Sequence, residues 1–327
     1  MLSIKNYNII SENKYKYLSF PDIIKSKKHK NRMYLVFRAS DGHHPIVSTL
    51  HLLISENNGI TWKEINKFNK NLKIHKYVWN CPRLCYINNS LCIICDMKNH
   101  QNERKCNFKT VIMDIDENNF QCIYSNITEI NGMVPDKIIK FKGNLYCANH
   151  IMDDKHGTLT QLVNMSRDNG ATWYDCNILA RHNNHAFCEA SLINYNEKYL
   201  VSYMRDNIKD RNLHKYISSD GINWTDNREI SICGHRATVL YENNRIFMSY
   251  RNTKEVGIGF MTAELNNRLE EKNIEKIQIE NDFPENLYHC GYTGLEKCND
   301  NLYIIVYYIK KDKDNPFIKS CFVEFKK

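Results

Sequence analysis

The stretch CEASLINYNEKYLVSYMRD, residues 188–206, consists of two short apolar runs joined by the polar turn NEK. The second run is rich in β-branched and aromatic residues, and two such runs around a polar turn predict a β-hairpin. Five other segments repeat this pattern: FPDIIKSKKHKNRMYLVFRA (20–39), CPRLCYINNSLCIICDMK (81–98), VPDKIIKFKGNLYCANHI (134–151), HRATVLYENNRIFMSYRNT (235–253) and GYTGLEKCNDNLYIIVYYI (291–309). The chain therefore contains six copies of one hairpin unit.

The spacing of the units indicates what each repeat forms. Aligned on their second residues, the units begin at Pro21, Pro82, Pro135, Glu189, Arg236 and Tyr292. The successive differences are 61, 53, 54, 47 and 56 residues, which suits a four-stranded blade with its loops. We therefore expect an all-β, six-bladed β-propeller of four-stranded antiparallel blades.

The same pattern predicts how the chain closes. Residues 3–10 can form a strand that joins the last blade beside SCFVEF (320–325) and covers its open edge. Because neither half could close alone, we expect residues 1–327 to form a single domain.

A second motif recurs between the hairpin units. Residues 166–173 read SRDNGATW, residues 55–62 follow the same S-x-D-x-G-x-T-W pattern with Asn57 in place of Asp, and residues 218–224 are one residue shorter. We expect hairpin turns in which the Asp or Asn bonds local backbone, Gly takes a positive φ and Trp packs over the turn. Because three of the four tryptophans serve such turns, the motif predicts structure and no chemistry.

Composition excludes several classes of protein. Of the 327 residues, 42% are apolar and 11% aromatic, enough for a packed core rather than a disordered chain. The net charge of +8 comes from charges spread along the chain; it suits a small anionic ligand or simply solvated lysines, and it is the only feature that favours nucleic acid. No apolar run reaches the length of a membrane span.

Cysteine usage and the N-terminus predict the location of the protein. The 13 cysteines show no disulfide framework, which favours a reducing compartment. MLSIKNYNII has no signal-peptide pattern, so we expect a cytoplasmic protein, with secretion by a non-classical route left open. Cys92 and Cys95 form one C-x-x-C, and no second pair stands at zinc spacing, so we expect neither metal nor cofactor.

Polar residues gather at two positions of the repeat. The first strands begin near Glu189, Arg236 and Tyr292, and the second strands end near Arg38, Asp96, His150, Arg205, Arg251 and Tyr307. In a propeller these positions line one mouth of the central funnel. Because such groups are costly to bury unpaired, they predict a polar binding site there.

These units resemble the sialidase superfamily. The W-ending turn motif is similar to its Asp box, and unit 188–206 resembles the sialidase unit that carries a Glu and a carboxylate-binding Arg, here Glu189 and Arg205. Unit 291–309 looks like the one with the nucleophilic Tyr, which would be Tyr292. YLSFPDII (17–24) resembles the Y/F-R-I-P strand with Ser19 in place of its Arg, and RASDGHHP (38–45) puts Asp41 where the family keeps its acid.

The resemblance implies an exo-α-sialidase-like glycoside hydrolase with a retaining mechanism. A neutral Tyr nucleophile avoids repulsion by the carboxylate of the substrate; Glu189 would take the proton of Tyr292, and Asp41 would protonate the leaving oxygen. The carboxylate would be held by arginines, which can bind it with two parallel hydrogen bonds. The candidates are Arg205, Arg251, Arg236 and Arg38, with Arg83 as a second substitute for the missing first-strand Arg.

The resemblance also implies further contacts and a partner. The further candidate substrate contacts are His43, His44, His150 and Asp96. The partner would be a sialylated glycan or a free sugar-acid glycoside, with the particular nonulosonic acid left open.

Three alternatives remain at this point. A sugar-binding propeller without catalysis is favoured by the loss of the first-strand Arg. A protein-interaction propeller would carry recurring WD or kelch signatures, and none recurs. Individual residues also have plain structural interpretations: Glu189 and Arg205 as an ion pair, Tyr292 as a strand aromatic, and Asp41 as a turn residue.

Overall fold

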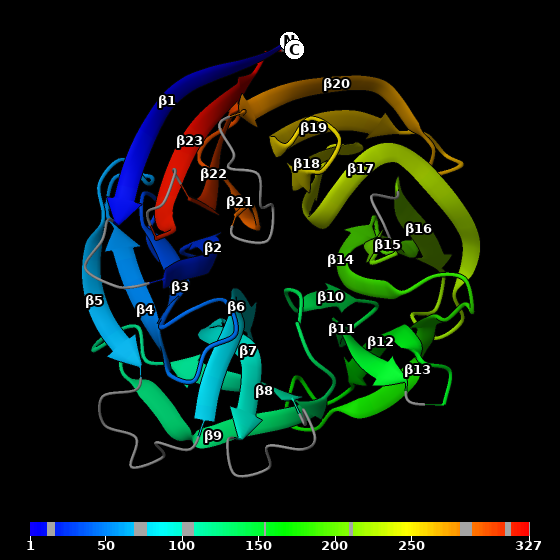
Figure 1. Ribbon diagram of the computed structural model, residues 1–327, viewed down its shortest axis with the longest axis horizontal. Coiled ribbons are helices and arrows are strands. Elements are labelled where there is room, and N and C mark those ends of the chain that lie inside the picture. Colours follow the sequence, from blue (N-terminus) through cyan, green and yellow to red (C-terminus); the bar gives the residue numbers. More distant parts are fainter. Residues whose placement is uncertain are drawn as a thin grey trace. The chain divides into compact units, whose positions relative to one another are not determined.

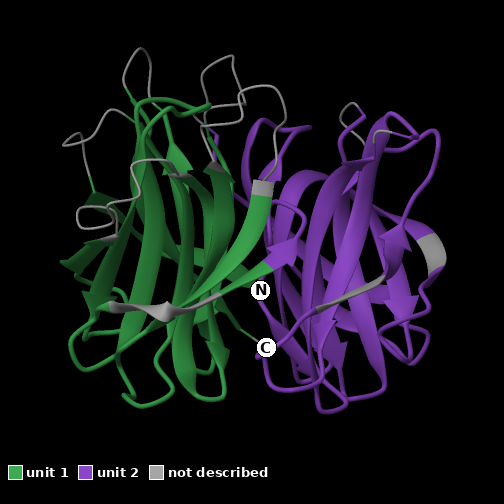
Figure 2. Ribbon diagram, turned by 90° about the horizontal axis from the view of Figure 1, so that it is seen from below, with its two compact units in different colours: residues 1–129, 282–327 green, residues 130–281 purple. Residues whose placement is uncertain are grey.

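The computed structural model describes residues 1–11, 17–68, 77–99, 108–153, 155–208, 212–281, 290–310 and 315–326. Within these ranges the chain forms strands and turns and no helix. None of the described segments is therefore a helix long and apolar enough to cross a membrane. The chain divides into two compact units, unit 1 (residues 1–129 and 282–327) and unit 2 (residues 130–281), which Figure 2 colours separately.

Unit 1 contains three four-stranded antiparallel sheets (Figure 1). The first sheet has the order β2 (Tyr17–Lys25), β3 (Met33–Ser40), β4 (Ser48–Ser55), β5 (Lys63–Phe68). The second has the order β6 (Tyr77–Ile87), β7 (Ser90–Asn99), β8 (Phe108–Ile115), β9 (Cys122–Asn131). The third has the order β1 (Leu2–Ser11), β23 (Phe317–Phe325), β22 (Leu302–Ile309), β21 (Thr293–Lys297).

Unit 2 contains one four-stranded and one seven-stranded sheet. The four-stranded sheet has the order β10 (Ile139–Phe141), β11 (Asn144–Asp153), β12 (Thr158–Ser166), β13 (Tyr174–Ala180). The other has the order β14 (Phe187–Tyr195), β15 (Tyr199–Asp206), β16 (Asn212–Ser218), β17 (Thr225–Glu242), β18 (Arg245–Asn252), β19 (Gly257–Leu265), β20 (Glu271–Glu280). The first part of β17 pairs with β16 and its last part, from Gly234, pairs with β18. The long strand β17 thus joins two groups of four strands.

The prediction of an N-terminal strand beside the last hairpin is confirmed. β1 pairs antiparallel with β23, from Leu2 opposite Phe325 to Ser11 opposite Ile318. The first and last strands of the chain therefore share one sheet, and β1 covers the edge that β23 would otherwise expose.

Burial follows the position of each strand in its sheet. β3 and β22 are buried along almost their whole length, as expected of strands covered on both faces. The outer strand β20 reads EKNIEKIQIE, with exposed Lys and Asn residues beside half-buried ones. In unit 1 one apolar cluster joins residues of the β2–β5 sheet, such as Val36 and Leu52, to residues of the β6–β9 sheet, such as Leu84 and Ile93. The core therefore lies between neighbouring sheets.

A β-bulge interrupts the first strand of the hairpin units. Between Cys188 opposite Arg205 and Ser191 opposite Tyr203, two residues of β14 face one residue of β15, and β2, β6 and β17 show the same shift in register. The first bulge residue of these four strands has a positive φ, and so does the residue at the same position of the other two hairpin units: Phe20 (54°), Cys81 (45°), Val134 (52°), Glu189 (54°), Arg236 (41°) and Gly291 (97°).

The bulge corrects the alignment predicted from the sequence. Glu189 and Arg236 occupy the positive-φ position, whereas Pro21, Pro82, Pro135 and Tyr292 each follow it by one residue. Tyr292 is therefore one position out of phase with Glu189. Tyr307, expected at the mouth, is fully buried opposite Thr293 and belongs to the core.

The residue two positions after the positive-φ residue links one hairpin unit to the next. In unit 1 the Asp22 carboxylate accepts a hydrogen bond from the Leu84 amide at 2.8 Å and one from Arg83 Nη1 at 3.1 Å. In unit 2 Asp136 accepts from the Leu192 amide at 3.3 Å, and Ser191 Oγ accepts from the Val239 amide at 3.3 Å. The backbone amide at the same position of the next hairpin unit donates each time, so these bonds align the first strands of successive hairpin units.

The turn motifs form as predicted. Asp168 Oδ1 accepts hydrogen bonds from Ser166 Oγ at 2.8 Å and the Thr172 amide at 2.9 Å. Trp173 Nε1 donates to the Gly170 carbonyl at 3.2 Å, and Gly170 has a φ of 93°. The turn at residues 55–62 repeats these bonds with Asn57, so its amide side chain replaces the carboxylate.

We expect Asp22→Ala to destabilise the protein by about 3–5 kcal/mol, because it leaves a buried guanidinium without its carboxylate. Asp22 is fully buried and Arg83 is 2% exposed. Urea unfolding measures the effect, and the exposed Asp300→Ala, expected to change stability by less than about 0.5 kcal/mol, is the matched control.

The double variant Asp22→Ala/Arg83→Met should recover part of this loss of stability, because it also removes the charge of the buried Arg83 guanidinium. If Asp22→Ala is no more destabilising than Asp300→Ala, the carboxylate does not hold the two sheets together.

Candidate functional site

The β14–β15 hairpin of unit 2 presents a buried ion pair. Arg205 Nη1 lies 3.0 Å from Glu189 Oε2, and the side chains are 13% and 7% exposed. Glu189 sits in the left-handed region of the bulge, where a residue other than glycine is strained and the side chain is turned away from the regular strand direction. The fold thus holds a carboxylate and a guanidinium together at the end of one hairpin.

The neighbouring hairpin adds two more arginines. Arg251 Nη1 donates to Nδ1 of His235 at 3.4 Å, across a backbone pair that joins β18 to β17. Arg236, the bulge residue of β17, donates from Nη2 to the Pro135 carbonyl at 2.7 Å. Both arginines are buried, with exposures of 4% and 3%.

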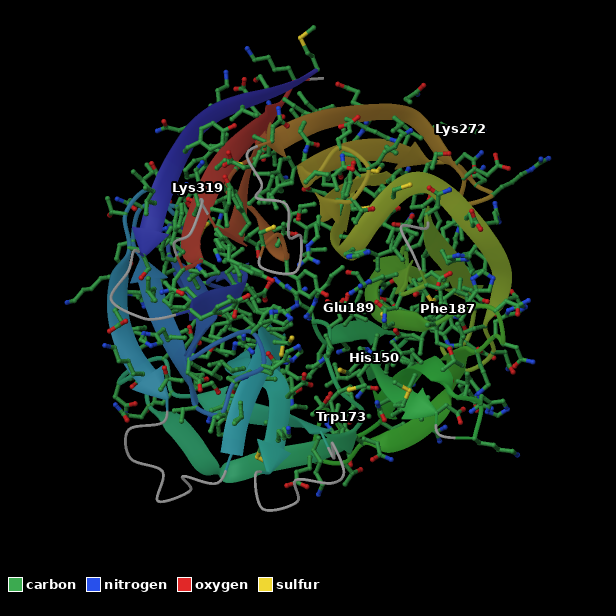
Figure 3. All side chains as sticks on the ribbon, viewed as in Figure 1. His150, Trp173, Phe187, Glu189, Lys272 and Lys319 are labelled. Carbon is green, nitrogen blue, oxygen red and sulfur yellow. The ribbon has the colours of Figure 1, made fainter. Side chains whose placement is uncertain are left out.

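His150 on β11 completes the group. It is 5% exposed, and its Nδ1 has no hydrogen-bond partner in the part of the chain that the structure describes. Figure 3 labels His150 and Glu189, both in unit 2, and the Glu189 charge acts on His150. Burial lowers the pKa of His150 to about 4; Glu189 acts in the opposite direction, and Arg236 and Arg205 lower the value further.

His235 is also held neutral. Burial lowers the pKa of His235 to about 3, and Arg205 and Arg251 add to the effect while Glu189 opposes it. A neutral imidazole can accept the hydrogen bond from Arg251 at its Nδ1.

We call these six residues the arginine cluster: Glu189, Arg205, Arg236, Arg251, His150 and His235. With both histidines neutral, three guanidinium groups stand against one carboxylate. Guanidinium groups donate paired hydrogen bonds to carboxylates, so the arginine cluster is suited to an anionic ligand. Five of the six residues are predicted from the sequence as site residues: Glu189, Arg205, Arg236, Arg251 and His150. His235 is missed. The signal that could have found it is its place directly before Arg236 at the start of a hairpin unit.

A second group of predicted residues lies in unit 1. Tyr292 is 8% exposed, and its ring packs against Phe20 with centroids 5.4 Å apart. The Arg38 guanidinium lies 4.7 Å from the centre of the same Phe20 ring, and the His43 ring lies 6.1 Å from it. Phe20 is the bulge residue of β2, so one bulge gathers Tyr292, Arg38 and His43.

Arg38 and Arg83 are bound to protein groups. Arg38 is fully buried and donates to Ser19 Oγ at 3.0 Å, to Asn80 Oδ1 at 2.7 Å and to the carbonyls of Gly42 and His43 at 3.2 Å. Arg83 donates to Asp22 and to the Thr293 carbonyl, both at 3.1 Å. Ser19, which stands where the sialidase strand has Arg, thus anchors Arg38.

The other predicted residues of unit 1 have separate surroundings. Asp41 is exposed and accepts hydrogen bonds from the amides of Ile46 and Val47, which shapes the loop after β3. His44 is exposed and packs edge-on against His43. Asp96 is buried on β7.

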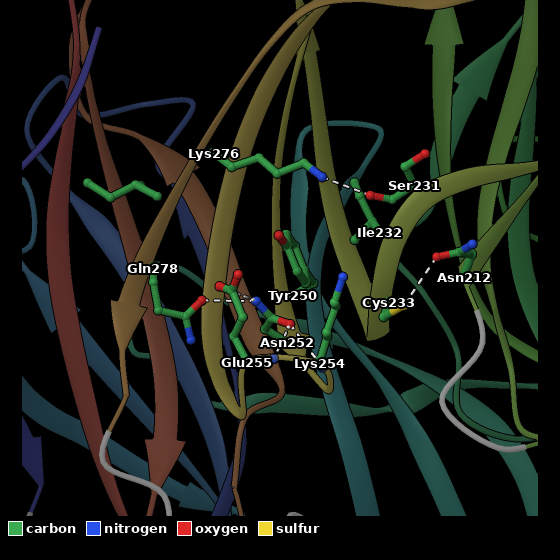
Figure 4. A pocket seen from close by; sticks show the side chains of 11 residues that line it. Asn212, Ser231, Ile232, Cys233, Tyr250, Asn252, Lys254, Glu255, Lys276 and Gln278 are labelled. Carbon is green, nitrogen blue, oxygen red and sulfur yellow. Dashed lines mark hydrogen bonds between the residues drawn. The ribbon is translucent and has the colours of Figure 1, made fainter.

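A separate cavity of about 380 Å³ lies between β16–β17 and β18–β20 of unit 2 (Figure 4). Tyr250 and Asn252 line it, whereas Arg251, between them on β18, bonds His235. Neighbouring residues of a strand point to opposite faces, so this cavity and the arginine cluster lie on different faces of β18. Lys276, Glu255 and Gln278 make its lining polar.

The two neutral histidines predict a stability that depends on pH. Both have a folded-state pKa below the ordinary value of 6.5, at about 4 for His150 and about 3 for His235. The contribution of the two neutral histidines to the free energy of unfolding is therefore complete above pH 6.5. It is lost as the pH falls toward 4 for His150 and 3 for His235, because the unfolded chain binds the protons at a higher pH than the folded chain does. Each should add about 1.4 kcal/mol per pH unit to the slope of unfolding free energy in this window.

Urea unfolding at pH 4.5–7 measures this slope. His150→Gln should reduce the slope by the amount that one titrating proton contributes, about 1.4 kcal/mol per pH unit. The matched control is His29→Ala, since His29 is exposed on the β2–β3 turn. Equal slopes in the wild type and His150→Gln would contradict a neutral buried His150.

Comparison with known proteins gives similarity in structure. The sequence matches no family model and no curated protein sequence. A protein of unknown function from Dyadobacter fermentans superposes with a TM-score of 0.80 at 17% identity, over 99% of both chains. A Hadza microbial sialidase gives 0.70 at 13% identity, over 95% of this chain and 66% of that one. A Penicillium chrysogenum alpha-L-arabinanase gives 0.73 at 12% identity, over 98% of both chains. At these identities the similarity shows the fold alone: the chain has a β-propeller fold like that of these proteins.

Proposed function

We propose that this protein is an exo-α-sialidase-like glycoside hydrolase that removes a terminal sialic acid or a related nonulosonic acid. The observation that carries the proposal is the arginine cluster of unit 2, in which Arg205 pairs with the single carboxylate, Glu189, and Arg236 and Arg251 act with them on the two histidines. The similarity in fold between this chain and a sialidase and an arabinanase supports glycoside hydrolysis as the reaction class.

The arginine cluster would bind the carboxylate of the sugar acid. Guanidinium groups stay charged at every working pH and match a carboxylate in shape. Among the predicted arginines, Arg83 forms a buried ion pair with Asp22, and Arg38 donates four hydrogen bonds to neighbouring protein groups. We therefore assign the substrate carboxylate to Arg205, Arg251 and Arg236.

Tyr292 and Glu189 would carry out the first displacement. The anomeric carbon of a sialic acid bears a carboxylate, which would repel a carboxylate nucleophile, and a phenol avoids that repulsion. A phenol has a pKa near 10 and needs a base. In the proposal Glu189 takes the proton as the Tyr292 oxygen attacks the anomeric carbon.

Asp41 would protonate the leaving oxygen, because it is an exposed carboxyl on the loop after β3. Water, which gives a proton to Asp41, then attacks the anomeric carbon; the bond to the Tyr292 oxygen breaks, Glu189 returns its proton to that oxygen, and the sugar leaves with its original anomeric configuration. His43 and His150 are proposed as neighbouring substrate contacts.

We further propose that the strands form six blades in one domain. Unit 1 supplies three four-stranded sheets, and unit 2 supplies one. The seven-stranded sheet counts as two blades joined through β17, because β17 changes its pairing partner from β16 to β18 near Gly234.

A sugar-acid-binding protein without catalysis is the second candidate. It is favoured by Ser19, which occupies the place of the family's first-strand Arg and accepts a hydrogen bond from Arg38. In that case the arginine cluster would bind a sialoside and release it unchanged.

A fluorogenic α-sialoside tests both candidates. We expect the wild type to hydrolyse it, and Tyr292→Phe and Glu189→Gln each to lower kcat by at least about 100-fold, because one removes the nucleophilic oxygen and the other the base. Tyr199→Phe, which alters a tyrosine that is 36% exposed, should be as active as the wild type.

Two results would count against the enzyme. Undiminished activity in Tyr292→Phe would remove Tyr292 from the mechanism. Binding of the sialoside without turnover, weakened in Arg205→Met, would instead favour the binding protein.

A further inference from the structure

Three potential metal ligands meet at the open end of the β14–β15 hairpin. His185 lies two residues before β14, Asp206 ends β15 opposite Phe187, and His214 lies on β16 opposite Met204. One ligand atom from each of His185, Asp206 and His214 lies within 4.8 Å of the others. This group is distinct from the arginine cluster, although Asp206 follows Arg205 in sequence.

The carboxylate is oriented by the backbone. Asp206 Oδ1 accepts hydrogen bonds from the amides of Ala186 at 3.0 Å and Ile208 at 3.1 Å. Oδ2 lies 2.7 Å from Nδ1 of His185. The two amides therefore fix one oxygen and direct the other toward the imidazoles, as outer hydrogen bonds do for metal-binding carboxylates.

The two imidazoles are held by aromatic packing. The His185 and His214 rings lie 4.9 Å apart at 73°. Phe187 stacks on His185 with centroids 5.0 Å apart and meets the His214 ring edge-on at 4.9 Å. Both rings are thus positioned by the same phenylalanine before any ion arrives.

From this arrangement we propose that His185, Asp206 and His214 bind one divalent transition-metal ion, with Zn²⁺ as the best match. Two imidazole nitrogens and one carboxylate oxygen form a ligand set typical of zinc, and sites with three protein ligands leave a fourth position for water. Asp206 and His214 are 0% and 1% exposed and His185 is 16% exposed, so an ion would enter past His185.

Binding requires only a small adjustment. Zinc bonds of roughly 2.1 Å allow two ligand atoms to lie at most roughly 4.2 Å apart, close to the 4.8 Å limit of the present group. The ion would replace the His185–Asp206 hydrogen bond and draw His214 away from the exposed Glu229, whose Oε1 lies 3.9 Å from its Nε2.

The position of the ion suggests a structural role. Phe187 opposite Asp206 is the last backbone pair of the hairpin, next to the pair formed by Cys188 and Arg205. An ion joining Asp206 to His185 and His214 would tie the end of β14 and β15 to β16. It would thereby steady the two strands that carry Glu189 and Arg205, without touching either side chain.

Zinc titration of the purified, chelator-treated protein tests the proposal. We expect isothermal titration calorimetry with ZnCl₂ to give one site per chain, and a melting temperature that rises with Zn²⁺. His185→Gln, chosen because His185 is the most exposed of the three, should weaken binding by more than about 100-fold, beyond the loss typical of outer-shell changes. Asp206→Asn should act in the same way.

His29→Ala, in which an exposed histidine distant in sequence is removed, should bind Zn²⁺ as the wild type does. Far-UV circular dichroism checks that each variant is folded. The proposal is overturned if the wild type binds no stoichiometric Zn²⁺, or if His185→Gln and His29→Ala bind it equally well, since the His185–Asp206 contact would then be an ordinary ion pair. The readout is metal binding, so it is independent of any sialidase activity.

Discussion

The backbone distortion at the start of each hairpin unit, which is a β-bulge in β2, β6, β14 and β17, is the constraint on which the rest of the structure depends. It places one residue per unit in the left-handed region, at a cost of about 1–3 kcal/mol where that residue is not glycine. In return, the acceptor two positions later reaches an amide of the next hairpin unit, as Asp22 does with Leu84 and Ser191 with Val239. The strain and the hydrogen bond between hairpin units therefore arise from the same backbone distortion.

The bulge also explains where the polar residues lie. In unit 2 the strained position is taken by Glu189 and Arg236, whose side chains the bulge turns out of the regular alternation of the strand. In unit 1 the same position is taken by Phe20, around which Tyr292 and Arg38 pack. The same backbone distortion thus presents charged side chains in some hairpin units and an aromatic ring in another.

The sequence was sufficient to predict the repeat, the W-ending turns, the closing strand β1 and the pairing of Glu189 with Arg205, because each depends on local pattern or on the fixed length of a hairpin. It could not reveal the offset of Tyr292, since a bulge adds a residue without changing the apolar pattern. It also could not show that Arg83 is held by Asp22, 61 residues away, because that ion pair forms only when two sheets pack. The neutral state of His235 likewise depends on burial and on arginines from two other strands.

The β14–β15 hairpin connects the two clusters of unit 2. Its end carries Arg205 and Asp206 side by side, and successive residues of a strand point to opposite faces. Arg205 therefore faces Glu189, while Asp206 faces His185. Because the two pairs share consecutive backbone, a change that loosens the Asp206 side alters the position of Arg205. A polar group that appears only structural can in this way determine how accurately the arginine cluster meets an anionic ligand.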